Sequence, residues 1–163
     1  MTLAVDSVRA ELTALVSPSQ VLTDTAACAA LAVDGKVPEC AVAPATPEHV
    51  AAVLRHAGEH HLAVIPRGNG TKLSIGNLPR RYDIALSLRH LNRVTHFEPR
   101  DLTISVEAGM TFGEFQRLAG QHGLWLPLDP RGGAEATIGE SSRRMRRGHC
   151  GRGSAARETW YWV

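Results

Sequence analysis

The residues best suited to chemistry in this 163-residue chain form a glycine-rich run after an apolar segment. The run is Gly68-Asn69-Gly70-Thr71, and the five apolar residues before it end at Pro66. Glycine can adopt positive φ and lets a ligand approach the main chain closely. Successive exposed N–H groups in such a turn bind anions, so a phosphate or pyrophosphate is the expected ligand. A tight loop that uses glycine only for turn geometry is an equally open interpretation.

Two familiar phosphate-binding loops are excluded by spacing. The P-loop pattern G-x-x-x-x-G-K-[ST] is absent from the sequence. The dinucleotide fingerprint G-x-G-x-x-G fails because Leu73 occupies the place of its third glycine, and the run does not open a predicted helix. The glycine run therefore needs support from the rest of the chain.

Composition indicates a globular domain with 44% apolar and 21% charged residues. The net charge of +2 hides an asymmetry, because residues 1–139 carry 12 basic and 14 acidic side chains, a balance of −2, whereas residues 140–163 carry six arginines and two glutamates. The charge of residues 1–139, called the body below, therefore does not indicate binding to nucleic acid. The three cysteines are widely spaced, which makes a disulfide framework or a zinc site improbable and the cytoplasm the expected location.

Hydrophobic periodicity predicts the elements that position the loop. We expect helices over 4–16, 46–61 and 111–123, and strands over 39–44, 62–66, 82–88, 93–99, 102–109 and 124–130. The pair 93–99 and 102–109 should form a hairpin, and 62–66 should be a buried strand. Thr46 is suited to cap the second helix, with Pro47 at its first position. This order predicts a mixed α+β domain.

The second predicted helix also carries histidines that could bind a metal. His56 and His60 are four residues apart, and His49 shares their side of the helix. The apolar stripe, predicted to be Val50, Val53, Leu54 and Ala57, lies opposite. We therefore interpret the histidines as part of a solvated face.

Three longer segments of the sequence indicate a protein family. They are "TPEHVAAVLRHAGEHHLAVIPRGNGTK", "DIALSLRHLNRVTHFEPRDLTISVEAGMTFGEFQRLAGQHGLWLPLDP" and "ATIG". Together they resemble the FAD-binding domain of the vanillyl-alcohol oxidase or PCMH type, and within it the FAD-binding subunit of bacterial glycolate oxidase. The resemblance covers roughly residues 36–139 and implies an α+β fold of mixed sheets with flanking helices, incomplete at its C-terminus.

The resemblance also implies which residues contact the cofactor. The glycine loop would wrap the FAD pyrophosphate, and the segments around 127–130 and 136–139 would touch the cofactor too. The cofactor-binding residues implied are Pro66, Arg67, Gly68, Asn69, Gly70, Thr71, Lys72, Leu128, Asp129, Thr137 and Gly139. Covalent members often attach FAD through a histidine in or near this loop, and residues 62–89 contain none, so non-covalent FAD is implied.

After Gly139 the sequence departs from the pattern of that family, which continues as a second glycine and a stretch of small residues. Residues 140–163 hold six of the 18 basic residues and two of the three tryptophans. The codons of Trp160-Tyr161-Trp162-Val163, shifted by one base, must read an apolar residue followed by Val-Leu-Gly. We therefore interpret residues 140–163 as an out-of-frame tail that does not pack on the body, with a genuine basic arm as the alternative.

The resulting prediction divides the chain into a helical lead-in (1–35), a partial FAD-binding domain (36–139) and the tail (140–163). The implied parent enzyme is a flavin-dependent oxidoreductase of a small 2-hydroxy acid such as glycolate, with possible partner subunits of a glycolate oxidase-like complex. No catalytic residue or metal is assigned, no membrane-spanning segment is expected, and the chain itself is expected to be inactive. The alternative is a small non-enzymatic module that binds a phosphate-bearing ligand or a partner.

Overall fold

A computed structural model describes residues 5–142 of the chain. The chain separates into two compact units. Unit 1 comprises the residues up to Arg67 together with Leu73–Leu91, and unit 2 comprises Gly68–Lys72 together with the residues from Asn92 onward. The glycine run predicted to bind an anion therefore belongs to unit 2, although the strand before it belongs to unit 1.

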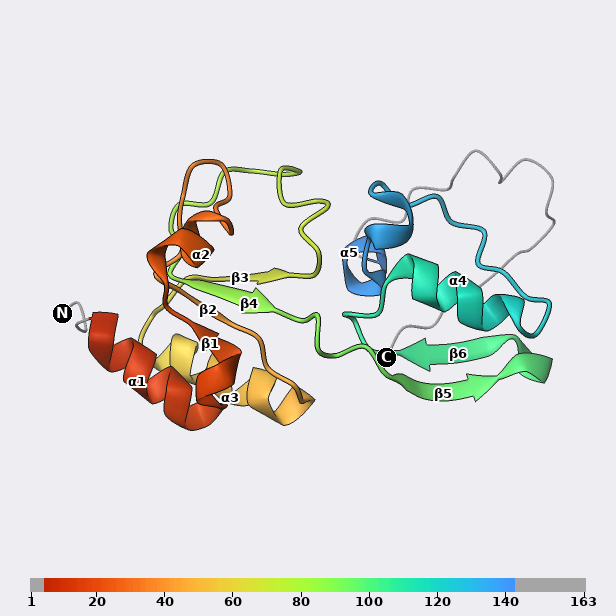
Figure 1. Cartoon of the computed structure of the whole chain (residues 1–163), viewed down its shortest axis with the longest axis horizontal. Coiled ribbons are helices and arrows are strands. Elements are labelled where there is room, and N and C mark those ends of the chain that lie inside the picture. The colour runs from red at the N-terminus through yellow and green to blue at the C-terminus, as the bar shows by residue number, and fades with distance from the viewer. Residues whose placement is uncertain (1–4, 143–163) are drawn as a thin grey trace. The chain divides into compact units, whose positions relative to one another are not determined.

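Figure 1 labels the helices and strands. The α-helices are α1 (Val5–Leu15), α2 (Thr25–Ala29), α3 (Pro47–Glu59), α4 (Phe112–Gly120) and α5 (Ile138–Ser142). The strands are β1 (Val21–Leu22), β2 (Cys40–Val42), β3 (Val64–Arg67), β4 (Ile84–Ser87), β5 (Val94–Glu98) and β6 (Thr103–Val106). Short 3-10 turns lie at Pro18–Gln20, Pro99–Asp101 and Gly133–Glu135. The α+β prediction is confirmed, whereas α2, β1 and α5 were not predicted.

Unit 1 is built on a four-stranded mixed sheet in the order β1-β2-β4-β3. β4 runs parallel to both β2 and β3, and β1 pairs with β2 in the antiparallel sense. The predicted strand over 62–66 is present as β3, but the prediction that it is buried is wrong, because β3 is an edge strand whose residues are partly or fully exposed. An edge position also explains how Pro66, which has no N–H for a second neighbour, fits in a strand.

The two faces of this sheet bury different side chains. Cys40 and Val42 of β2 and Ile84 and Leu86 of β4 face α1 and α3, where they join a cluster of buried apolar residues. Their neighbours Ala41 and Ala85 face the other side and pack with Val33 and Tyr82. Figure 1 shows α1 and α3 on one side of the sheet and α2 on the other. This alternation follows from the two-residue period of a strand.

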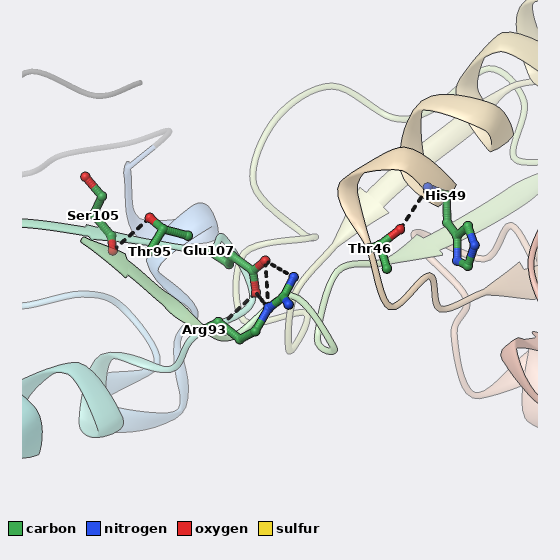
Figure 2. A network of polar contacts seen from close by, with 6 residues as sticks. All are labelled: Thr46, His49, Arg93, Thr95, Ser105 and Glu107. Atoms are coloured by element: carbon green, nitrogen blue, oxygen red, sulfur yellow. Dashed lines mark hydrogen bonds and ion pairs between the residues drawn. The ribbon is translucent and has the colours of Figure 1, made fainter. Parts of the chain in front are cut away.

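The start of α3 matches the prediction, but its buried face is rotated. The Thr46 hydroxyl accepts a 3.2 Å hydrogen bond from the N–H of His49, as Figure 2 shows, and caps the helix. Val53 and Ala57 are buried as predicted, but Leu54 is 48% exposed and His56 is only 8% exposed. The interpretation of His56 as part of a solvated face is wrong, because α1 packs against α3 on the His56 side.

In unit 2 the predicted hairpin of β5 and β6 is present, with a register irregularity between Val94 and His96. At its open end, the N–H of Glu107 donates to the carbonyl of Arg93 at 2.9 Å, and the N–H of Arg93 donates to the carboxylate of Glu107 at 2.8 Å. The two side chains also form an ion pair of 2.9 Å, which Figure 2 shows. Hydrogen bonds from Arg93 lower the pKa of Glu107 below its ordinary value. At the irregularity the Thr95 hydroxyl donates to the carbonyl of Ser105 at 3.2 Å (Figure 2). Side chains thus secure the part of the ladder that the bulge disturbs.

The core of unit 2 lies along α4. Thr111 and Glu114 form a reciprocal capping box at its start. The buried residues of this core are Met110, Phe112, Phe115, Ala119, Leu126 and Ile138. The predicted strand over 124–130 is wrong, because both backbone groups of Leu126 bond to the side chain of Gln116 at 2.9 Å. Pro127 and Pro130 also remove donors that a strand would need.

The predicted tail begins inside the described residues. Residues 140–142 belong to α5, and Ser141 is buried, so the expectation that the whole tail fails to pack is wrong for these residues. Residues 143–163, which hold the arginine cluster and Cys150, lie outside the described residues. Within 5–142 no helix is both long enough and apolar enough to span a bilayer.

Candidate functional site

The glycine loop, defined here as Gly68–Lys72, lies against the segment Ala136–Ser141 within unit 2. The two are linked by a close approach of Gly68 to Thr137, whose side chain a Cβ at position 68 would overlap. Thr137 is 1% exposed, so its side chain cannot move into solvent to make room. Only glycine fits at position 68, and the reason is space rather than turn geometry.

The loop is shaped to present its donors to an anion. Gly70 has a φ of +81°, which side-chain-bearing residues rarely adopt. The Asn69 amide donates a 2.7 Å hydrogen bond to the carbonyl of Glu135 and fixes the loop on its other side. With the loop held at 68 and 69, the N–H of Gly70 and the hydroxyl of Thr71 point to one place.

That place is filled by the carboxylate of Glu140. The N–H of Gly70 donates to Oε1 at 2.6 Å, and the Thr71 hydroxyl donates to Oε2 at 2.9 Å. The N–H of Thr137 also reaches Oε2, at 3.4 Å. Hydrogen bonds to an ionised acceptor are short and strong. The loop and the start of α5 therefore form a cradle that binds an oxyanion, here supplied by the chain itself.

Lys72 adds a positive charge beside this cradle. Its Nζ lies 3.3 Å from the hydroxyl of Ser141, which itself donates to the carbonyl of Thr137 at 2.9 Å. Partial burial lowers the pKa of Lys72, and the nearby Glu140 carboxylate raises it. A phosphate in place of the Glu140 carboxylate would likewise favour the charged ammonium, so Lys72 is suited to neutralise a phosphate.

The other sequence-predicted residues have different surroundings. Pro66 is exposed on β3, and Arg67 ends β3 in unit 1, where its guanidinium lies beside Tyr82. Leu128 packs on the core of unit 2, whereas Asp129 is exposed. The structure therefore joins only part of the predicted set to the cradle.

Gly139 contacts Ala108, which lies outside the glycine loop. Its N–H donates to the carbonyl of Ala108 at 2.9 Å, and a Cβ at position 139 would lie 2.9 Å from that same oxygen. This contact gives Gly139 a packing role at the start of α5.

Sequence reasoning missed Glu140 and Ser141 because both stood in the presumed tail. A signal was available: Thr137-Ile138-Gly139-Glu140 matches the capping-box pattern, in which a threonine precedes a glutamate by three positions. The structure shows both halves of that box, since the N–H of Glu140 also donates to Thr137 Oγ1 at 3.3 Å.

Comparison with known proteins identifies the family. Residues 38–141 match the family model of an FAD binding domain. The chain belongs to this FAD-binding domain family. The match includes the whole glycine loop and Thr137–Ser141, so the cradle lies inside the FAD-binding domain.

Curated relatives include oxidoreductases of 2-hydroxy acids. The chain is 29% identical over 103 residues to the glycolate oxidase subunit GlcD of Bacillus subtilis, covering 63% of this chain and 22% of that protein. It is 30% identical over 134 residues to D-2-hydroxyglutarate dehydrogenase of Stutzerimonas stutzeri, covering 79% of this chain and 29% of that protein. The FAD-binding domain thus spans less than a third of the length of these relatives.

A solved structure supports the fold. The structure of p-cresol methylhydroxylase with substrate bound superposes with a TM-score of 0.72 at 21% identity, covering 84% of this chain and 28% of that one. At this identity the likeness concerns the fold alone. The α+β prediction and the PCMH-type resemblance are therefore both confirmed.

Proposed function

We propose that this FAD-binding domain holds the pyrophosphate of FAD in the cradle, as part of an oxidoreductase acting on a small 2-hydroxy acid. The observation that carries the proposal is the carboxylate of Glu140 bound by Gly70 and Thr71 at 2.6 and 2.9 Å. A group that binds one oxyanion through main-chain and hydroxyl donors is suited to a phosphate oxygen. Membership of the FAD-binding family names the phosphate-bearing ligand.

The roles of the loop residues follow from their contacts. The Gly70 N–H and the Thr71 hydroxyl would donate to phosphate oxygens, and Lys72 would neutralise part of the charge. Asn69 and Gly68 would keep the loop in place through Glu135 and Thr137. Direct contacts of Pro66, Arg67, Leu128, Asp129 and Gly139 with FAD stay predictions.

Glu140 competes with the cofactor for the same donors. Its carboxylate must leave the cradle before a phosphate can enter, because two anions would repel each other there. The sequence pattern of the family has a glycine at this position, which leaves the donors open. We therefore expect FAD to bind this chain more weakly than it binds a chain with glycine at position 140.

Bound FAD supplies the redox chemistry by accepting a hydride from the substrate. The residues of the cradle would bind and orient the cofactor, and no catalytic residue is assigned. Glycolate or a related 2-hydroxy acid is proposed as the substrate class from the names of the relatives. Partner subunits of a glycolate oxidase-like complex are proposed on the same basis. That this chain turns over no substrate, and that residues 140–163 are out of frame, stay predictions.

The test is to titrate the purified chain with FAD and to measure binding by the quenching of flavin fluorescence. We expect saturable binding that Gly70→Val abolishes, because valine cannot adopt the φ of Gly70 without strain. Gly58→Val is the matched control, since Gly58 lies in unit 1 with open space around its Cα. Binding that Gly70→Val leaves unchanged would contradict the assignment of the cradle.

Two further measurements separate the finer predictions. Acid precipitation should release all flavin into solution if FAD is bound non-covalently. The non-enzymatic alternative is less favoured. It predicts salt-sensitive binding to nucleic acid that is lost when residues 140–163 are deleted.

A further inference from the structure

The side chains of Glu11, His56 and His60 converge between α1 and α3 in unit 1. Nδ1 of His56 lies 3.6 Å from Oε2 of Glu11, and Nε2 of His60 lies 3.5 Å from the same oxygen. One ligand-capable atom of each residue lies within 4.8 Å of the other two. Glu11 lies 45 positions before His56 and 49 before His60, so the packing of α1 on α3 creates the cluster.

The two contacts are poorly explained as hydrogen bonds. An N–H···O hydrogen bond normally spans about 2.7–3.2 Å, and both distances to Glu11 are longer. The two imidazole rings also lie close together, with their centroids 4.4 Å apart. The side chain of His56 is also buried, with the residue only 8% exposed.

The same distances suit ligands that share a metal ion. Zinc lies about 2.0–2.2 Å from histidine nitrogen and carboxylate oxygen, which places two ligands of a tetrahedral site about 3.4 Å apart. The separations of 3.5 and 3.6 Å are close to that value. The i, i+4 spacing of His56 and His60 puts both rings on the same side of α3. Two imidazoles and one carboxylate form a donor set that zinc commonly takes.

A fourth ligand can reach the cluster from solvent. A hollow of about 330 Å³ borders Glu11 and His56, and Arg55 and Glu59 also line it. Their opposite charges offset each other, so the hollow adds no strong repulsion toward a cation. The side chain of His60 is 30% exposed, which leaves room for a water molecule at the open position.

We propose that Glu11, His56 and His60 bind a zinc ion, with water as the fourth ligand. The ion would tie α1 to α3 and stabilise unit 1. This site is independent of the FAD cradle, which lies in unit 2. It also gives a role to the buried His56, which the FAD-binding site does not use.

The test uses the full chain after its metals have been removed with a chelator. We expect isothermal titration to show one Zn²⁺ per chain and thermal unfolding to move to higher temperature with zinc. Co²⁺ should give the intense visible absorption of a four-coordinate site. His60→Gln and Glu11→Gln should each weaken zinc binding by at least about 100-fold. Both side chains are partly exposed, so circular dichroism should show that these variants still fold.

His90→Gln is the matched control, because His90 is an exposed histidine of unit 1 outside the cluster. It should bind zinc like the unchanged chain. Absence of stoichiometric binding to the unchanged chain would overturn the proposal. So would binding that survives both His60→Gln and Glu11→Gln, because the ion would then be held by other residues.

Discussion

The backbone N–H of Gly70 donates a 2.6 Å hydrogen bond to Oε1 of Glu140, a residue 70 positions later in the chain. Thr71 binds the other oxygen of the same carboxylate. A loop predicted to bind a phosphate thus holds an acidic side chain of its own domain. This contact makes Glu140 the residue whose replacement tests the site most directly.

Glu140→Gly should bind FAD about tenfold more tightly than the unchanged chain. The estimate corresponds to one charge-assisted hydrogen bond, worth about 1.5 kcal/mol, that no longer has to be broken. Fluorescence titration with FAD measures the change. Asp101→Gly removes an equal charge from an exposed position of unit 2 outside the cradle and should leave the dissociation constant unaltered. Equal affinity of Glu140→Gly and the unchanged chain would show that Glu140 does not compete with the cofactor.

Gly68→Ala should destabilise unit 2 by about 1–3 kcal/mol, because the new methyl group overlaps the buried side chain of Thr137. Replacing Thr137 by alanine in the same chain should recover part of the loss. Gly58→Ala is the control, since a Cβ there meets no atom within 4 Å and alanine favours the helix. Chemical denaturation measures the free energy of unfolding of all three variants. A Gly68→Ala chain as stable as the original would mean that the loop and Thr137 are not in close contact.

The ion pair of Arg93 and Glu107 should make the stability of the hairpin depend on pH. Because the folded-state pKa of Glu107 is below the unfolded value of 4.5, its contribution is full above pH 4.5 and is lost as the pH falls through the folded-state pKa. The free energy of unfolding of Glu107→Gln should therefore be lower than that of the unchanged chain at pH 7, and the two values should converge in acid. A difference that stays constant down to pH 3 would contradict this. Glu135→Gln serves as the neutral comparison.

Cys40 should be unreactive in the folded chain. Its side chain is 1% exposed. Burial is the main reason that the pKa of Cys40 is raised to about 11, and the nearby Cys28 raises it further. At pH 8 only about one thiol in 1,000 would be ionised. Alkylation with iodoacetamide, read for each cysteine-containing peptide by mass spectrometry, should label Cys40 only after a denaturant is added. Rapid labelling without denaturant would show that unit 1 opens readily.

Local sequence features determined most of the elements. The capping threonine and the proline after it were enough to fix the start of α3, and the alternation of polar and apolar residues was enough for β6. Periodicity failed for residues 124–130, because apolar residues there fill the core of unit 2 while the side chain of Gln116 takes the backbone bonds of Leu126. The hydrophobic periodicity of a segment does not show a hydrogen bond to a side chain ten positions away.

The sequence alone predicts an anion-binding loop at Gly68–Thr71, and it leaves a tight loop that uses glycine only for turn geometry equally open. Tertiary structure decided which anion the loop meets, since Glu140 lies 70 residues from Gly70 and no local pattern relates them. It likewise decided that His56 is buried beside Glu11, because the orientation of α3 depends on the helix that packs on it. Short-range preferences set the elements, and the contacts between distant residues set the sites.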